Sequence, residues 1–299
     1  MIICGTLNPQ LEIPPTINIS LTKPLPQNFS LPSGIIYYIK HTPTATDSSY
    51  QKILQTCKFF ITGKYVLTVG NFYIKEESND IMLDYLTRIN ALSENLTFKL
   101  WLKRSLDIIV NSDIMTKFLK NIYRCNLMDI TISHQSFSFN NYLMLIEGGG
   151  IKELSLYNNI IKYGNGKMVP FEELMQQVPN VIMFTFSYTQ TPQSPFNSKT
   201  AEKLTALPKF EHLKYLKIYD IYPKFNAIHF CDFIKKNGGS YGITFCSSAI
   251  NEAWVKMFDT ELKERDFIVK MKEYSDILPF SKSNNTQNLT SIEVRKKIG

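Results

Sequence analysis

The sequence predicts an α/β protein made of repeated strand–helix units whose strands form a parallel sheet. Three observations lead to this fold class. A nine-residue pattern of apolar and polar positions recurs six times, its copies begin 24 to 32 residues apart, and helix-like stretches lie between them. Strands joined by crossover helices at such a spacing run parallel to one another. The 299-residue chain is long enough to bury a substantial core.

The recurring pattern reads apolar-x-x-apolar-x-apolar-x-x-polar, and its clearest copy runs from Ile151 to Asn159. Its fourth and sixth positions are two residues apart, so a strand directs both side chains to one face and the intervening residue to the other. The pattern therefore predicts six strands. Their fourth and sixth positions are Leu100 and Leu102, Ile130 and Ile132, Leu154 and Leu156, Phe184 and Phe186, Leu216 and Ile218, and Ile243 and Phe245.

Apolar residues at three- and four-residue steps predict amphipathic helices between the strands. Pro170 suits a first helical turn, whereas Gly148-Gly149-Gly150 and Gly238-Gly239 suit helix ends. Such a unit cannot bury its apolar face alone, so neighbouring units must stack, with strands on one surface and helices on the other. The apolar positions are Ile114, Phe118, Leu119 and Ile122, then Phe171, Leu174, Met175 and Val178, then Ile228, Phe230, Phe233 and Ile234.

The segment from Ile151 to Asn159 resembles the signature of leucine-rich repeats, and the spacing of the copies lies in or just above that family's range. The resemblance covers about half of the chain, within residues 96–267. It implies an α/β solenoid with a parallel sheet on the concave face. Most copies lack the closing asparagine, so the family's asparagine ladder is not expected throughout.

A doubly wound nucleotide-binding sheet is the alternative fold. Its strands would be buried on both faces and would read as continuous apolar runs. Here polar residues alternate with apolar ones, as Ser155 and Lys217 do. A sheet covered on one face fits this alternation better.

Residues 29–62 predict a short helical module, which follows an extended, proline-rich lead-in over residues 1–28. Ser30 can cap a helix that has Pro32 in its first turn, and Pro43 ends it. The apolar stripe of this helix is Ile35, Ile36 and Ile39. Two short amphipathic helices cannot bury their apolar surface alone, so the module needs a partner or the following domain.

The module resembles an F-box. The matching residues, in order, are Leu31-Pro32, Ile35-Ile36, Ile39, Pro43, Asp47, Cys57-Lys58 and Phe60. The resemblance implies that Leu31, Pro32, Ile35, Ile36 and Ile39 dock on the small Skp-type adaptor of a cullin–RING ubiquitin ligase. Ser33-Gly34 replaces the usual acidic-bearing pair, and Phe60 stands where Trp is common. A helical hairpin that merely caps the repeats is the alternative.

Two further segments flank the repeats. Residues 63–95 are expected to link the module to the repeats and contain a strand-like stretch from Tyr65 to Ile74. Residues 268–299 form a polar C-terminal tail. Because few large apolar side chains follow Phe280, the tail is expected to be disordered from there on.

The sequence predicts a cytoplasmic protein and is also compatible with a nuclear one. The chain begins without a signal pattern, and no apolar run approaches the roughly 20 residues of a membrane span. Its five cysteines are scattered, which favours reduced thiols over disulfides or zinc. The net charge of +7 permits attraction to nucleic acid, but the basic residues are spread along the chain, so this is the less favoured function.

The sequence carries no convincing catalytic, cofactor or metal motif. The stretch from Gly238 to Gly242 matches Gly-x-Ser-x-Gly, but the expected helix precedes the serine and the strand follows it, which inverts the topology of a nucleophile elbow. The glycines at Gly164 and Gly166 predict a turn, and the four histidines lack metal-ligand spacing. An enzyme is therefore not expected.

The combined resemblances imply a substrate-receptor subunit of an SCF-type (cullin–RING) ubiquitin ligase, which holds a target protein on the repeat sheet. A protein-interaction scaffold without a ligase is the alternative. Side chains from the exposed sheet face would bind the target, and Trp and Tyr are favoured at such interfaces. The expected partner-binding residues are Trp101, Glu153, Tyr157, Tyr215, Lys217 and Tyr219.

Overall fold

A computed structural model describes most of the chain from residue 65 onward. The described ranges are 65–75, 80–83, 87–90, 98–110, 114–188, 194–219, 226–237, 242–247, 252–262, 267–274 and 289–296. The lead-in and the F-box-like module, with Leu31, Pro32, Ile35, Ile36 and Ile39, lie outside these ranges.

The repeated pattern forms one mostly parallel sheet, as the sequence predicts, and the α/β class is confirmed. Each of the six copies supplies a strand, and consecutive copies are neighbours in the sheet. The strands are β4 (Phe98–Ile109), β6 (Asp129–Ser133), β8 (Glu153–Tyr157), β10 (Met183–Ser187), β11 (Tyr215–Tyr219) and β12 (Gly242–Ser247). All five pairings between them are parallel.

The fourth position of the pattern is in register from β6 to β12. Ile130 pairs with Leu154, Leu154 with Phe184, Phe184 with Leu216, and Leu216 with Ile243. In β4, however, Leu106 and Ile108 occupy the register positions, not Leu100 and Leu102. The strand runs past the expected repeat because its first half pairs with β5 (Ile122–Cys125) and its second half with β6. The alignment of the first copy was therefore wrong by six residues.

Both ends of the sheet are completed by antiparallel strands. At the N-terminal end, β1 (Tyr65–Lys75) runs parallel to β4, and β2 (Asp80–Leu83) and β3 (Thr87–Asn90) follow it antiparallel. At the C-terminal end, β14 (Leu289–Lys296) lies between β12 and β13 (Phe267–Tyr274). The expectation of disorder after Phe280 is therefore wrong for β14, because its backbone pairs with a strand on each side.

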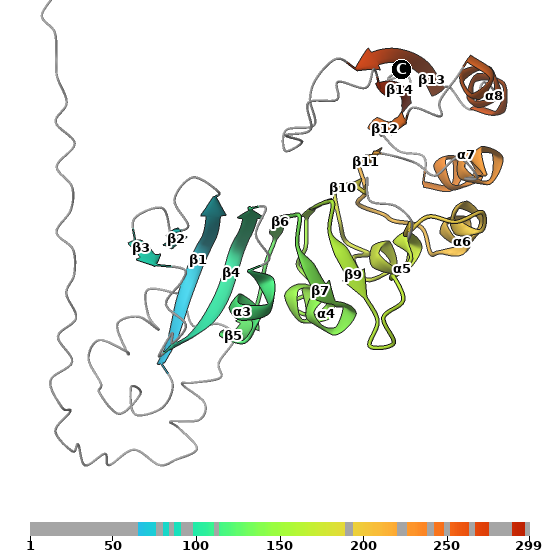
Figure 1. The fold of residues 1–299 in the computed structure, drawn as a ribbon. Coiled ribbons are helices and arrows are strands. Elements are labelled where there is room, and N and C mark those ends of the chain that lie inside the picture. Colours follow the sequence, from blue (N-terminus) through green and yellow to red (C-terminus); the bar gives the residue numbers. More distant parts are fainter. Residues whose placement is uncertain are drawn as a thin grey trace, which may run out of the picture.

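Six helices of the described chain connect the strands: α3 (Met115–Leu119), α4 (Phe139–Ile146), α5 (Phe171–Gln176), α6 (Thr200–Ala206), α7 (Ala227–Asn237) and α8 (Glu252–Leu262). Helices α4 to α8 lie together on one side of the row of strands (Figure 1). The Ser138 hydroxyl accepts a hydrogen bond from the Asn141 amide and caps α4. The three glycines after α4 end it as expected, since Gly149 has φ +64°.

The core lies between the sheet and these helices. Register residues such as Leu154, Leu156, Phe184 and Leu216 are fully buried. Phe171 of α5 packs on Phe184, Phe186 and Phe196 with ring centroids 5.0 to 5.5 Å apart. The buried Tyr142 hydroxyl of α4 donates to the Leu174 carbonyl of α5, which ties consecutive units together.

The closing polar position of the pattern forms an amide ladder. The Asn159 side chain accepts from the Gln135 backbone amide and donates to the Ile132 carbonyl of the preceding unit. Gln135 does the same one unit earlier, accepting from Ile114 and donating to Val110. Glutamine therefore replaces asparagine without loss of the ladder. Just beyond these residues, β7 (Ser136–Ser138) and β9 (Ile160–Lys162) form a second, two-stranded sheet.

Candidate functional site

The face of the sheet that points away from the helices is polar. On β6, β8, β10 and β11 its central rung is Thr131, Ser155, Thr185 and Lys217, which are in direct register, and Asp107 continues the rung on β4. We call this rung and the two rungs that flank it the polar face. The flanking residues are Ser105, Asp129, Glu153, Met183 and Tyr215 on one side and Ile109, Ser133, Tyr157, Ser187 and Tyr219 on the other.

Tyr157 covers the middle of the polar face. Its side chain shares hydrogen bonds with Ser155 and Thr185, and these two residues are only 9% and 3% exposed. Burial raises the pKa of Tyr157, and the two hydrogen bonds partly offset that rise. The half-buried Tyr157 ring therefore covers the hydroxyl groups of Ser155 and Thr185.

Three carboxylates lie on neighbouring strands of the polar face. Asp129 of β6 stands directly opposite the exposed Glu153 of β8, and Asp107 lies on the next strand. Burial raises the pKa of Asp129, and nearby Arg104 partly offsets this. For Asp107, burial raises the pKa, a hydrogen bond with Thr131 lowers it and the charge of Asp129 raises it. Direct opposition of like charges on a sheet is destabilising.

The far end of the polar face presents aromatic and basic groups. Tyr215 is 48% exposed and Lys217 is half-buried, and both lie on β11. Tyr219 occupies the same strand but is only 9% exposed, so its expected exposure is wrong. Glu153, Tyr157, Tyr215, Lys217 and Tyr219 thus share one face, as the sequence predicts, with β10 between the two strands that carry them.

Trp101 does not join this group. It pairs with Thr68 of β1 and Arg124 of β5 (Ile122–Cys125), in the half of β4 that precedes the register of the repeats. Its ring is 4% exposed, and its indole N–H donates to the Asn126 side chain over 2.8 Å. The expectation of an exposed Trp101 is therefore wrong. The Nζ of Lys103 lies 4.5 Å and the guanidinium carbon of Arg124 5.3 Å from the ring centroid.

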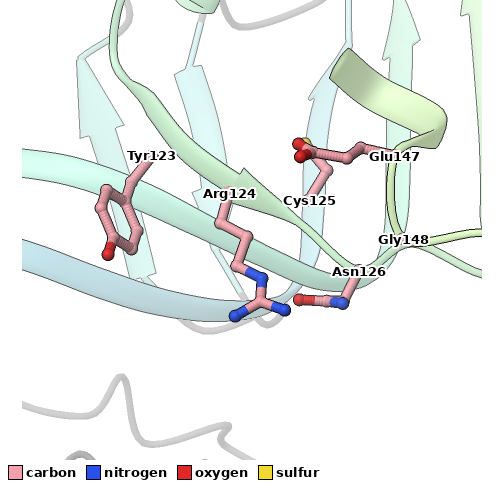
Figure 2. Close-up of a pocket in the computed structure, with 6 residues that line it drawn as sticks. All are labelled: Tyr123, Arg124, Cys125, Asn126, Glu147 and Gly148. Atoms are coloured by element: carbon pink, nitrogen blue, oxygen red, sulfur yellow. The ribbon is translucent and has the colours of Figure 1, made fainter. Parts of the chain in front are cut away.

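A hollow of about 360 Å³ opens beside Arg124 (Figure 2). It lies between β5 and the end of α4. Its lining residues are Tyr123, Arg124, Cys125, Asn126, Glu147 and Gly148. This site was not predicted from the sequence, because β5 is only four residues long and its first residue, Ile122, fits the helical spacing of the preceding apolar residues.

The described residues add little that favours catalysis. Gly166 has φ +80° and lies in a turn in which the Tyr163 amide donates to the Lys167 carbonyl, as a loop turn requires. Within the part of the chain that the structure describes, no three His, Cys, Asp or Glu side chains gather as metal ligands. The serine of the inverted Gly-x-Ser-x-Gly stretch, Ser240, lies outside the described ranges.

No family model matches the chain, and no curated protein or solved structure matches it significantly. None of the helices in the described ranges is long and apolar enough to cross a membrane.

Proposed function

We propose that the protein is a non-catalytic protein-binding subunit whose polar face holds a target protein. The observation that carries this proposal is the exposure of Glu153 and Tyr215, with half-buried Tyr157 and Lys217, on a sheet face that the helices leave uncovered. Tyrosines supply large contact area with few rotatable bonds, and neighbouring charges supply specificity.

The repeats are proposed to form a leucine-rich-repeat-like solenoid with the polar face on its concave side. Two features support this. The row of strands curves with helices on its outer side (Figure 1), and Gln135 and Asn159 form an amide ladder at the position that closes the repeat pattern. A concave face lets a target contact several strands at once.

We further propose that residues 29–62 are an F-box that attaches this binding face to a Skp-type adaptor, which makes the protein a substrate receptor of a cullin–RING ubiquitin ligase. The support is the ordered match from Leu31 to Phe60. The protein would perform no chemistry itself. It would raise the effective concentration of a target lysine near the ubiquitin-charged enzyme.

Adaptor binding is tested with the full chain and a purified Skp-type adaptor by pull-down and calorimetry. Ile36→Asp with Ile39→Asp should abolish binding, because burying charge against an apolar groove costs several kcal/mol. The matched control is Ile228→Asp, since Ile228 is 50% exposed on α7 and lies outside the module. A double variant that binds the adaptor as tightly as the wild type would eliminate the F-box proposal. If the wild type does not bind the adaptor either, the protein is instead a protein-interaction scaffold without a ligase.

A further inference from the structure

The polar face is accessible where its strands begin and largely closed where they end. At the strand ends, Ser133 and Ser187 are 1% exposed and Tyr219 is 9% exposed. At the strand starts, the side chains from β6 to β11 are exposed or half-buried. In register, these residues are Asp129, Glu153, Met183 and Tyr215. We call them the open row, and a partner of the polar face contacts them first.

The open row is acidic at β6 and β8. Asp129 and Glu153 stand opposite each other there, and Asp107 lies beside them on β4. Burial raises the pKa of Asp107, and the negative charge of Asp129 adds to that rise, so these two carboxylates repel each other. None of the ion pairs among the described residues involves the three carboxylates. A cationic side chain of a partner relieves a repulsion that Arg104 offsets only in part.

The other end of the open row is aromatic and basic. Exposed Tyr215 begins β11, and half-buried Lys217 follows it on the same face. Lys217 takes part in none of the ion pairs among the described residues. Between β8 and β11, the strand β10 presents the uncharged Met183 and Thr185. The accessible part of the face thus changes from acidic to neutral to basic between β6 and β11.

Sheet geometry sets the spacing between the two charged ends. Neighbouring strands lie about 4.8 Å apart, and successive residues on one face of a strand lie about 6.6 Å apart. Lys217 is one such step and two strands from Glu153, and one step and three strands from Asp129. The corresponding Cα distances are about 12 and 16 Å. Side chains four residues apart on an extended chain are about 13 Å apart, which matches this span.

We propose that the polar face binds an extended segment of the target that crosses β6 to β11 and carries a basic and an acidic side chain four residues apart. The basic side chain lies between Asp129 and Glu153, and the acidic side chain lies on Lys217. Arginine suits the first place, because its planar fork reaches two carboxylates. The proposal rests on the proposed function and adds the charge pattern of the target.

The test measures the binding of short peptides to the full chain by fluorescence anisotropy at low ionic strength, where surface charges are little screened. The probe is the capped, rhodamine-labelled peptide Ser-Thr-Arg-Thr-Val-Thr-Glu-Thr-Ser. Its two charges cancel, so the net charge of +7 does not attract it. Replacing its Arg or its Glu with Gln should weaken binding about fivefold, the upper range for an accessible ion pair.

A peptide of the same composition tests the spacing. In Ser-Thr-Val-Thr-Arg-Thr-Glu-Thr-Ser the charges are two residues apart, about 7 Å, and reach only one end of the open row at a time. This peptide should bind about fivefold more weakly than the probe. Equal binding of the two peptides would contradict recognition at both ends.

Charge reversal on the protein identifies the contacts. Lys217→Glu should weaken binding of the probe about tenfold and strengthen binding of its version with Arg at both charged positions. Glu153→Lys should weaken binding of the probe and strengthen binding of the version with Glu at both positions. The matched control is Glu202→Lys on the exposed side of α6, which should bind every peptide like the wild type. If both reversals melt and bind all three peptides like the wild type, the proposal is overturned.

Failure of this charge pattern and failure of the polar face are separate results. If no peptide binds, but a photo-crosslinker at position 215 captures a protein that binds Tyr215→Ala more weakly, the polar face stands and the charge pattern is wrong. If position 215 captures no protein either, both are wrong. An oligothymidylate that binds the wild type more tightly than the probe, and loses binding in Lys217→Glu, would assign this part of the face to nucleic acid instead.

Discussion

Asp129 and Glu153 are the residues whose arrangement is hardest to justify by stability alone. They stand opposite each other on β6 and β8, and Asp107 adds a third carboxylate on the adjoining strand. On the helix side of the sheet, by contrast, Glu172 and Glu261 pair with Lys203 and Lys235. The protein thus keeps like charges opposed on the face that we propose to bind a target, with only partial compensation from Arg104, and this costs stability.

Replacing Asp129 with Asn should stabilise the fold by about 0.2–1 kcal/mol at neutral pH, the range for removing a like charge from a cross-strand pair. Arg104 offsets part of the repulsion, so the lower half of that range is expected. Urea unfolding of the variant and the wild type measures the difference. The control is Asp259→Asn at an exposed position of α8, which should be neutral.

The gain from Asp129→Asn should depend on pH. Because the pKa of folded Asp129 is raised above its ordinary value of 3.8, ionisation is less favourable in the folded than in the unfolded chain. That cost is present above the folded-state pKa and disappears as the pH falls to the unfolded value. The advantage of the variant should therefore shrink as the pH approaches 3.8. An advantage that grows on acidification would contradict the assignment.

At the scale of elements, the strand β14 contributes to the sheet through its position between two other strands. Its sequence is polar enough to suggest a disordered tail, yet its backbone pairs with β12 over six residues and with β13 over eight. Without β14, β12 would become an open edge of the sheet. An edge of that kind exposes unpaired backbone groups and favours aggregation.

Val294→Pro should destabilise the protein by at least about 2 kcal/mol, because proline removes a backbone donor in a strand that has neighbours on both sides. Thermal unfolding of the full chain measures the loss. Ile298→Pro, beyond the end of β14, is the matched control and should melt with the wild type. If Val294→Pro also melts with the wild type, β14 does not contribute to the stability of the sheet.

At the scale of the whole molecule, the polar face carries charges of both signs. Its carboxylates are those of Asp107, Asp129 and Glu153 on β4, β6 and β8, and its lysine, Lys217, lies on β11. The net charge of +7 therefore does not describe this surface. A partner of the polar face is selected by local charge and aromatic contacts.

Replacing Tyr215 and Lys217 with Ala should weaken target binding by about 2 kcal/mol while adaptor binding persists, since exposed interface tyrosines are frequent hot spots. A photo-crosslinker at position 215 identifies the target, and one at exposed Glu202 of α6 is the control for the helix side. The affinity of the captured protein is then measured for the double variant and for Glu202→Ala. If only Glu202→Ala weakens binding, the target binds the helix side instead.

The sequence by itself determined the strand–helix repeat, the strand positions from β6 to β12 and the shared face of Glu153, Tyr157, Tyr215 and Lys217. These follow from the two-residue periodicity of a strand and the spacing of the copies, which are local properties.

Only the tertiary structure decided the register of β4, the burial of Trp101 and Tyr219, and the place of β14. Each depends on which segment lies alongside another. Trp101 is buried because Arg124 and Asn126 approach it from a strand more than twenty residues away, and β14 is ordered because two distant strands satisfy its backbone. Contacts of this kind leave no periodic trace in the sequence, because the same local pattern is compatible with several neighbours.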